Sequence, residues 1–223
     1  MATKAPRRTA QRILDASLAL FNRYGEPNVS TTLISSDLNI SPGNLYYHFP
    51  AKEELVNALF DRYQKALIPL LAAATDIRNI EDAWFFIHSI FEIVWEYRFL
   101  YRDLNDLLSR NRLLESEIKD VILHKTSAFK SLLQGLQLSS ALDITVEERQ
   151  ALAVHMVVIL TWWLSYEYVR DPRNALEDAN AQQSVLKGAV QLLRLLLPYL
   201  EAHERAHLQN LLKAYDTQGS ESI

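Results

Sequence analysis

The chain has 223 residues, of which 49% are hydrophobic, and a formal net charge of −4 at pH 7. This length and apolar content suit one large domain or a small domain joined to a larger one, and they exclude disorder for most of the chain. The absence of cysteine excludes disulfides, zinc–thiolate sites and a thiol nucleophile.

The two ends of the chain differ in charge. Residues 1–52 hold six basic and three acidic residues, a balance of +3, so the remaining residues carry −7. A basic N-terminal part on an acidic body fits a small polyanion-binding module attached to a larger domain with another task. The basic start leads into LDASLALF, which contains Asp15 and is too short and polar for a signal peptide. We therefore expect a cytoplasmic protein.

The first predicted helix covers residues 9–24. Apolar residues from Ile13 to Tyr24 repeat at the spacing of one helix face, and Gly25 with Pro27 ends the run. The basic residues that precede this helix form either a solvated tail or an arm that reaches into the minor groove of DNA.

Two short helices are predicted next. A serine or threonine within residues 30–32 can cap the first of them, and Asn39 tolerates the left-handed backbone of the turn that follows it. Ser41 can cap the second, with Pro42 at its first position, and Pro50 stops it.

The rest of the chain is helical in pattern and contains no strand alternation of useful length, which predicts an all-α fold. The expected helices cover residues 51–74, 80–97, 101–111, 113–137, 146–169, 178–197 and 202–214.

Consecutive aromatic side chains at residues 46–49 occupy most of the circumference of a helix, so some of them must face outward. A short helix, a turn over residues 39–42 and a second short helix form a helix-turn-helix, whose second helix enters the major groove. The outward aromatics would then meet DNA. Of the two tyrosines, we expect one to pack on the first helix, with Tyr47 more buried than Tyr46.

Other residues of the second short helix have distinct expected roles. Asn44 can read a base edge, and Gly43 allows close approach of a sugar–phosphate backbone. Leu45 and Phe49, four residues apart, would hold the helix on the core.

The run TTLISSDLNISPGNLYYHFPAKEELV, placed after a helix that ends in LFNRYG, resembles the DNA-binding domain of TetR-type transcriptional regulators over about residues 9–60. The resemblance implies a homodimeric, all-α regulator with an N-terminal helix-turn-helix domain and a larger helical ligand-binding and dimerisation domain. It implies phosphate contacts for Thr31, Thr32 and Lys52, and a recognition surface on the third helix. The full set of expected DNA contacts, with one residue from the basic arm, is Arg8, Thr31, Thr32, Ser41, Pro42, Gly43, Asn44, Tyr46, Tyr47, His48 and Lys52.

We place the DNA-binding domain over residues 1–52, the ligand-binding and dimerisation domain over residues 53–215, and a disordered tail over residues 216–223. The resemblance implies that the helices over 146–169 and 178–197 pair with those of a second copy. The apolar segment over 151–169 approaches the length of a membrane span, but polar residues interrupt it, so burial within a dimer is expected and a membrane location is not.

The segments FNRYGEPNVST, ISPGNLYYHFPAKEELV and YRFLYRDL resemble, within the family, regulators associated with polyhydroxyalkanoate or fatty-acid metabolism. This closer resemblance implies an apolar effector, either a fatty acid or an acyl-CoA. Aromatic residues at helical spacing form either the wall of its pocket or plain core, and the lone His88 and His155 fit hydrogen-bonded core histidines better than ligand contacts. The candidate ligand contacts are Trp84, Phe85, His88, Phe91, Trp95, Arg98, Trp162 and Tyr166.

The string HERAH at residues 203–207 matches the H-E-x-x-H pattern of zinc proteases. It lies in a polar helix near the C-terminus with no sequence after it that could build a cleft. We therefore expect no catalytic residue, no metal and no cofactor. The expected function is a repressor that an effector releases from a palindromic operator. The alternative is a dimeric small-molecule binding or interaction protein that does not bind an operator.

Overall fold

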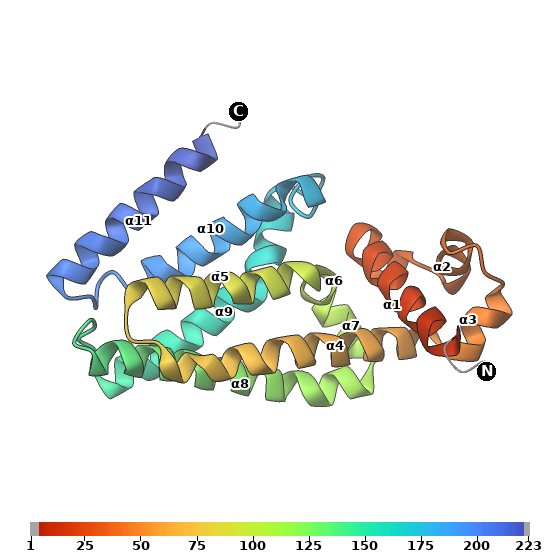
Figure 1. The fold of residues 1–223 in the computed structure, drawn as a ribbon, viewed down its shortest axis with the longest axis horizontal. Coiled ribbons are helices and arrows are strands. Elements are labelled where there is room, and N and C mark those ends of the chain that lie inside the picture. Colours follow the sequence, from red (N-terminus) through yellow and green to blue (C-terminus); the bar gives the residue numbers. More distant parts are fainter. Residues whose placement is uncertain (1–4, 221–223) are drawn as a thin grey trace. The chain divides into compact units, whose positions relative to one another are not determined.

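The computed structural model describes the backbone of residues 5–220 and the side chains of residues 8–213. Within this range the chain forms helices joined by short turns, and its β-structure is limited to one isolated bridge between Leu142 and Leu200 (Figure 1). The predicted all-α fold is confirmed. The α-helices are α1 (Ala5–Tyr24), α2 (Thr31–Asp37), α3 (Pro42–His48), α4 (Lys52–Ala72), α5 (Ile80–Glu96), α6 (Arg98–Arg102), α7 (Leu104–Arg110), α8 (Arg112–Leu138), α9 (Val146–Arg170), α10 (Ala181–Arg194) and α11 (Ala202–Ser220). Short 3-10 helices are η1 (Glu26–Asn28), η2 (Ala73–Asp76) and η3 (Asp178–Asn180).

Contacts divide the chain into two compact units. Unit 1 consists of Met1–Lys65 and Tyr97–Ile118, and unit 2 consists of Ala66–Glu96 and Lys119–Ile223. These units differ from a simple division near residue 52, because the segment 97–118 packs with the N-terminal helices. The chain therefore passes between the units three times.

The short helices of unit 1 begin and end where the local sequence dictates. Ser30 caps α2, since its Oγ accepts a hydrogen bond from the backbone N–H of Leu33 at 3.1 Å. Ser41 caps α3 in the same way, with the backbone N–H of Asn44 at 3.2 Å. Asn39 has φ 54° in the turn between them, which confirms its predicted left-handed conformation.

The segment 97–118 is joined to the N-terminal helices by buried contacts. The rings of Phe21 in α1 and Phe99 in α6 lie 5.3 Å apart. The backbone N–H of Phe99 donates to the side-chain oxygen of Asn22 at 3.1 Å, and the hydroxyls of Tyr63 and Tyr101 are hydrogen-bonded at 2.6 Å. Because these polar groups are buried and paired, α6 has a defined register on α1 and on the first part of α4.

Several predicted boundaries need correction. Helix α1 begins at Ala5, so Arg8 lies in a helix and not in an extended arm. Lys4 and the side chain of Arg7 lie outside the described residues. The helix expected over 101–111 is two helices, α6 and α7, because the backbone leaves helical geometry at Asp103.

The C-terminal part also differs from expectation. The helix predicted over 178–197 starts as the 3-10 turn η3, and α10 itself ends at Arg194. Helix α11 extends to Ser220, into the residues where a disordered tail was expected. Residues 221–223 lie outside the described residues.

In unit 2, helix α10 packs on α5 and α9 (Figure 1). A β-carbon at Gly188 would lie 2.4 Å from the ring of Phe91 and 2.8 Å from that of Trp163, so glycine is what permits this approach. The indole N–H of Trp163 donates to the carbonyl of Ser184 at 3.2 Å. Helix α9 starts with a capping box, and by length and composition it could cross a membrane, although 44% of its most apolar window is buried within the fold.

Candidate nucleic-acid interface

Helices α2 and α3 form the predicted helix-turn-helix, and a hydrogen bond between their side chains connects them. The hydroxyls of Thr31, at the start of α2, and Tyr46, in α3, are hydrogen-bonded at 2.9 Å. Leu45 is fully buried and Phe49 is half-buried, so the expected packing of α3 on the core is confirmed for Leu45.

The side chains predicted to contact DNA lie mostly on the surface of this motif. Thr31 and His48 are half-buried, and the others in α2, α3 and the turn are exposed. Exposure is what a groove-binding surface requires, because base edges and phosphates must replace water around these groups. The exposed members are Thr32, Ser41, Pro42, Gly43, Asn44, Tyr46 and Tyr47.

The relative burial of the two tyrosines was predicted wrongly. Tyr47 is 78% exposed and Tyr46 is 45% exposed. The hydroxyl bond to Thr31 holds Tyr46 across the turn, whereas the ring of Tyr47 meets only the ring of His48 edge-on, at 5.1 Å, among the aromatic contacts of the described residues. Tyr47 is therefore the aromatic side chain of α3 that projects farthest into solvent.

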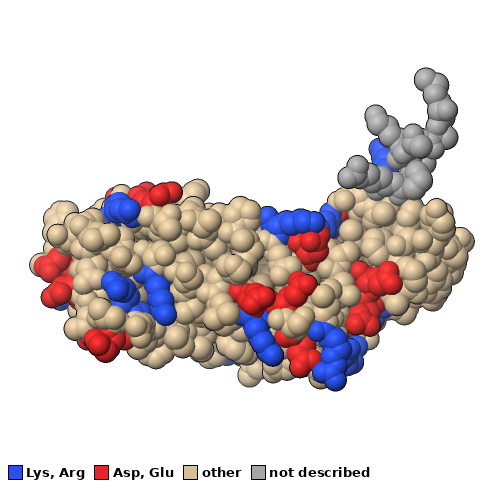
Figure 2. Space-filling model, turned by 90° about the horizontal axis from the view of Figure 1, so that it is seen from below, with Lys and Arg blue, Asp and Glu red and all other residues tan. Residues whose placement is uncertain are grey.

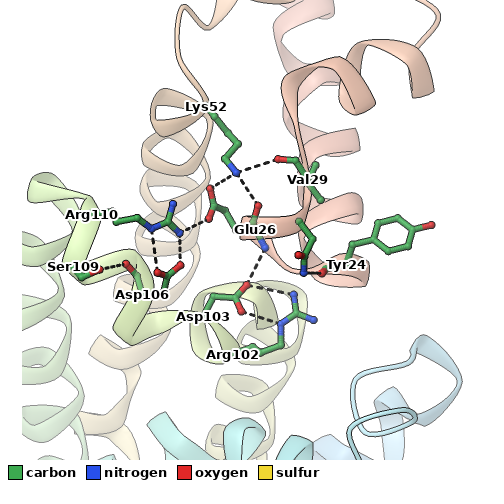
Figure 3. Close-up of polar contacts among 10 residues, drawn as sticks. Tyr24, Glu26, Val29, Lys52, Arg102, Asp103, Asp106, Ser109 and Arg110 are labelled. Carbon is green, nitrogen blue, oxygen red and sulfur yellow. Dashed lines mark hydrogen bonds and ion pairs between the residues drawn. The ribbon is translucent and has the colours of Figure 1, made fainter.

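Lys52, predicted to bind a phosphate, has protein partners for its ammonium group (Figure 3). Its Nζ lies 2.9 Å from the Glu26 carboxylate Oε1, and it donates to the backbone carbonyls of Glu26 at 2.9 Å and Val29 at 3.1 Å. The side chain is 27% exposed. A phosphate contact would have to share or replace these bonds.

The carboxylate of Glu26 is the centre of a larger polar cluster that the sequence did not suggest (Figure 3). Arg110 in α7 donates to Glu26 Oε2 at 2.9 Å, and the backbone N–H of Glu26 donates to the Asp103 carboxylate at 2.9 Å. Arg110 also pairs with Asp106, and Arg102 pairs with Asp103. We call Glu26, Lys52, Arg102, Asp103, Asp106 and Arg110 the Glu26 cluster.

The charged side chains of the face shown in Figure 2 do not form a continuous basic strip. Lysine and arginine lie beside aspartate and glutamate in small groups, with wide uncharged areas between them. On this face, attraction to a polyanion depends on local groups and not on one large positive field.

The residues predicted to bind an effector do not line one common pocket wall, because they differ in burial and belong to two units. Phe91 and Trp95 of α5 are buried, and Phe91 packs against Gly188. Phe85, Trp162 and Tyr166 are exposed, so they do not line the interior of unit 2. Arg98 is buried, but it belongs to unit 1.

Within the described residues, one unpaired buried polar atom belongs to His88, which was predicted to contact the effector. Trp84 and His88 are stacked, with ring centroids 5.1 Å apart. His88 Nδ1 and Thr161 Oγ1 are buried atoms without a hydrogen-bond partner in the described part of the chain, and such atoms call for an explanation. His155, by contrast, is exposed, so its predicted place in the core is wrong.

The HERAH segment shows no metal-binding arrangement. His203 is exposed, while His207 Nε2 lies 2.7 Å from the Glu81 carboxylate. Among the residues that the structure describes, no three histidine, cysteine or acidic side chains converge as metal ligands would.

Two models of one family match most of the chain. A model described as "Bacterial regulatory proteins, tetR family" matches residues 13–59, and one described as "Bacterial transcriptional repressor" matches residues 62–208. The chain therefore belongs to the TetR family of bacterial transcriptional regulators, and it is a regulator and not an enzyme.

Individual relatives agree. A crystal structure of a TetR-family regulator from Marinobacter aquaeolei VT8 has a TM-score of 0.80 and 30% identity, over 93% of this chain and 98% of that one. The biofilm operon negative transcriptional regulator IcaR of Staphylococcus epidermidis is 23% identical over 180 residues, 75% of this chain and 92% of that protein. The nucleoid occlusion factor SlmA of Glaesserella parasuis is 28% identical over 98 residues, 44% of this chain, and the match spans about half of that protein, 47%.

Proposed function

We propose that the protein is a cytoplasmic, homodimeric repressor that binds an inverted-repeat operator and is released from it by a small apolar effector. The observation that carries this proposal is the exposed surface of α3, which sits within a helix-turn-helix of a family of transcriptional regulators. The effector would bind better to the state whose two recognition helices are wrongly spaced, so operator affinity falls by the coupling free energy.

Some contacts to DNA position the protein on the sugar–phosphate backbone, and others read the base sequence. We assign base reading to Asn44, because an exposed amide at the start of α3 can form a bidentate bond to adenine. Tyr47, His48 and Thr32 have groups that can donate to phosphates, and Arg8 in α1 can add a charge contact. The two recognition helices of a dimer address major-groove faces about 34 to 36 Å apart, which requires an inverted repeat.

The effector class rests on different grounds. The unpartnered Nδ1 of His88 and Oγ1 of Thr161 offer hydrogen bonds to a polar head within unit 2. The aromatic residues of α5 offer apolar contact, and the resemblance to regulators of fatty-acid metabolism supports a fatty acid or an acyl-CoA as the first compounds to test.

Selection of bound fragments from the genome of the source organism, followed by footprinting at low salt, tests the proposal. We expect an enriched palindrome, protection of both half-sites, and an affinity that falls with salt. Protection of no palindromic site would instead favour a dimeric binding protein that does not read DNA. Asn44→Ala should relax discrimination at specific base pairs by roughly 1 to 3 kcal/mol, whereas Asn105→Ala, a change of the same kind at an exposed site in α7, should not.

A further inference from the structure

Glu26 is a buried carboxylate that two cations share. Only 3% of its side chain is exposed, and its two oxygens lie 2.9 Å from Lys52 Nζ and 2.9 Å from Arg110 Nη2 (Figure 3). A charge at this depth is tolerated only when it is paired and hydrogen-bonded. The position of Glu26 is thus coupled to the start of α4 and to the end of α7.

All three donors of the Lys52 ammonium group have partners within the protein. An ammonium group has three donors, and those of Lys52 have three acceptors within the protein: the Glu26 carboxylate and the carbonyls of Glu26 and Val29. Moving Lys52 to a phosphate would remove one counter-charge from the buried carboxylate. It would also take a donor from two carbonyls of the loop that precedes α2.

The Glu26 cluster is formally neutral. It contains three cations, Lys52, Arg102 and Arg110, and three carboxylates, Glu26, Asp103 and Asp106. The pairs are therefore complete as they stand, and withdrawal of one cation would leave a net negative charge beside the DNA-binding helices.

The cluster also holds the loop between α1 and α2. Asp103 accepts from the backbone N–H of Glu26 at 2.9 Å, and Arg102 donates to the carbonyl of Phe21 at 3.0 Å, near the end of α1. Gly25 lies between these points with φ 87°, and a β-carbon there would lie 2.6 Å from Arg102 Nη2. The backbone of this loop is therefore fitted closely to α6.

This loop leads directly to the recognition elements. Glu26 precedes Ser30, the cap of α2, by four residues, and the next residue, Thr31, is bonded to Tyr46 of α3. A shift of Glu26 relative to Arg110 would therefore move the start of α2, and α3 with it.

We propose that Glu26 and Arg110 are positioning residues for operator binding, and that Lys52 serves in the same ion-pair cluster instead of binding a phosphate. The inference rests on the proposed function, since it concerns how the recognition helix is placed for an operator. Loss of the pair misplaces α2 and α3, which weakens recognition of a defined sequence. General attraction to DNA, which needs no defined placement of α3, is retained.

The test compares two DNA duplexes over a range of KCl concentrations. One is the operator fragment recovered by genomic selection, and the other is a duplex of equal length with the same bases in scrambled order. The full-length variants are Glu26→Gln, Arg110→Gln, the double variant and Lys52→Met. Glu115→Gln is the matched control, because it breaks an exposed ion pair, Arg112–Glu115, within unit 1.

We expect Glu26→Gln and Arg110→Gln each to weaken operator binding by about tenfold or more, with scrambled-duplex binding almost unchanged. The double variant should lose little more operator affinity than the weaker-binding single variant, because both substitutions break the same Glu26–Arg110 ion pair. Lys52→Met should leave the salt dependence on scrambled DNA unchanged, whereas loss of a phosphate ligand would reduce its slope by about 0.9. The control should bind both duplexes as the unchanged protein does.

Several results would overturn the proposal. These are a reduced salt slope for Lys52→Met, tighter binding by Glu26→Gln through a released Lys52, or operator affinities in both single variants equal to that of the unchanged protein. Arg110 is 47% exposed, so Arg110→Gln remains a valid test even where Glu26→Gln reduces folding, which thermal melting will show. Failure of the proposed function would be seen earlier, as a genomic selection that enriches no fragment.

Discussion

Gly43 occupies a position where the protein itself leaves room for a larger side chain. A β-carbon there would approach nothing closer than the Ser41 hydroxyl, at 4.0 Å, and the residue lies in α3 with ordinary helical backbone. Glycine in a helix is destabilising by roughly 0.5 to 1 kcal/mol relative to alanine, so its presence here has no explanation within the fold. Close approach of a DNA backbone supplies one.

Gly43→Ala should therefore raise the stability of the protein by up to about 1 kcal/mol and weaken operator binding. The added methyl group fits the free protein but occupies space that the DNA backbone needs. Urea unfolding and operator titration measure the two effects. Ser127→Ala, at an exposed position of α8 in unit 2, is the control and should leave DNA binding unchanged. Unimpaired operator binding by Gly43→Ala would show that no close approach occurs there.

Lys125 in α8 is a buried residue with an unusual titration. It is 1% exposed, and burial lowers the pKa of its ammonium group from its ordinary value of 10.5 to about 7. Between these two values the unfolded chain binds a proton that the folded protein does not. The free energy of unfolding should therefore rise with pH in this window, by at most about 1.4 kcal/mol per pH unit from this group.

Lys125→Met should remove that contribution. We expect the variant to gain stability relative to the unchanged protein at pH 7, and we expect this advantage to shrink by roughly 2 kcal/mol by pH 9. Urea unfolding at both pH values measures the change. Lys130→Met, which removes an exposed lysine of the same helix, should show no such trend. An advantage that is constant with pH would mean that Lys125 is charged throughout the window.

At the scale of elements, local signals explain what the sequence predicted well. The caps Ser30 and Ser41 and the left-handed Asn39 are determined by neighbours within three residues, and the structure has them as expected. The break at Asp103 was missed, because neither glycine nor proline marks it. The helix before the break, α6, is bonded to α1, which is distant in sequence.

Long-range pairing also explains what was missed in the candidate site. Exposure of the α3 residues follows from helix periodicity and was largely predictable. The partner of Lys52 was not, because Glu26 lies 26 residues before Lys52 in the sequence. Arg110, the second cation on Glu26, lies 84 residues after Glu26, and no periodic pattern connects the three residues. A single charged residue in a loop gives no sign in the sequence that it will be buried.

Helix α9 presents a row of apolar side chains that the chain itself does not cover. Val154, Val158, Trp162 and Tyr166 are all exposed and follow one another at four-residue steps. A contiguous exposed row of large apolar residues marks an association surface. Dimers are typical of the family, and this row is where we expect the second copy to pack.

Val158→Glu should therefore convert the dimer to a monomer and abolish tight operator binding, because a charge would be buried in the interface. Sedimentation equilibrium gives the oligomeric state. Leu123→Glu, the same kind of change at another exposed apolar residue, lies on α8 and should leave the dimer intact. A Val158→Glu protein that remains dimeric would place the interface elsewhere.

For the whole molecule, the four tryptophans provide a direct report on effector binding. Trp84, Trp95, Trp162 and Trp163 all belong to unit 2. Titration with fatty acids and acyl-CoA compounds of increasing length should change their emission and release the operator in parallel. Each buried CH₂ adds about 0.8 kcal/mol to binding, until the chain fills its site.

His88→Phe should weaken binding of the polar head while keeping the dependence on chain length, because it removes the Nδ1 atom and retains an aromatic ring. Phe85→Ala, at an exposed position of the same helix, is the control. Emission changes without operator release would exclude acyl compounds as inducers. An absence of response at every chain length would leave the aromatic residues of α5 as core.

Because the chain passes between its units three times, recombination between the genes of two relatives can separate residues that belong to one unit. A gene fusion made after residue 65 would give the N-terminal helices of one relative the residues 97–118 of another. Glu26 and Lys52 would then come from one parent, and Arg102, Asp103 and Arg110 from the other. Exchange of DNA specificity between relatives of this chain therefore requires both stretches of unit 1 to be inherited together, and a single crossover between residues 65 and 97 separates them.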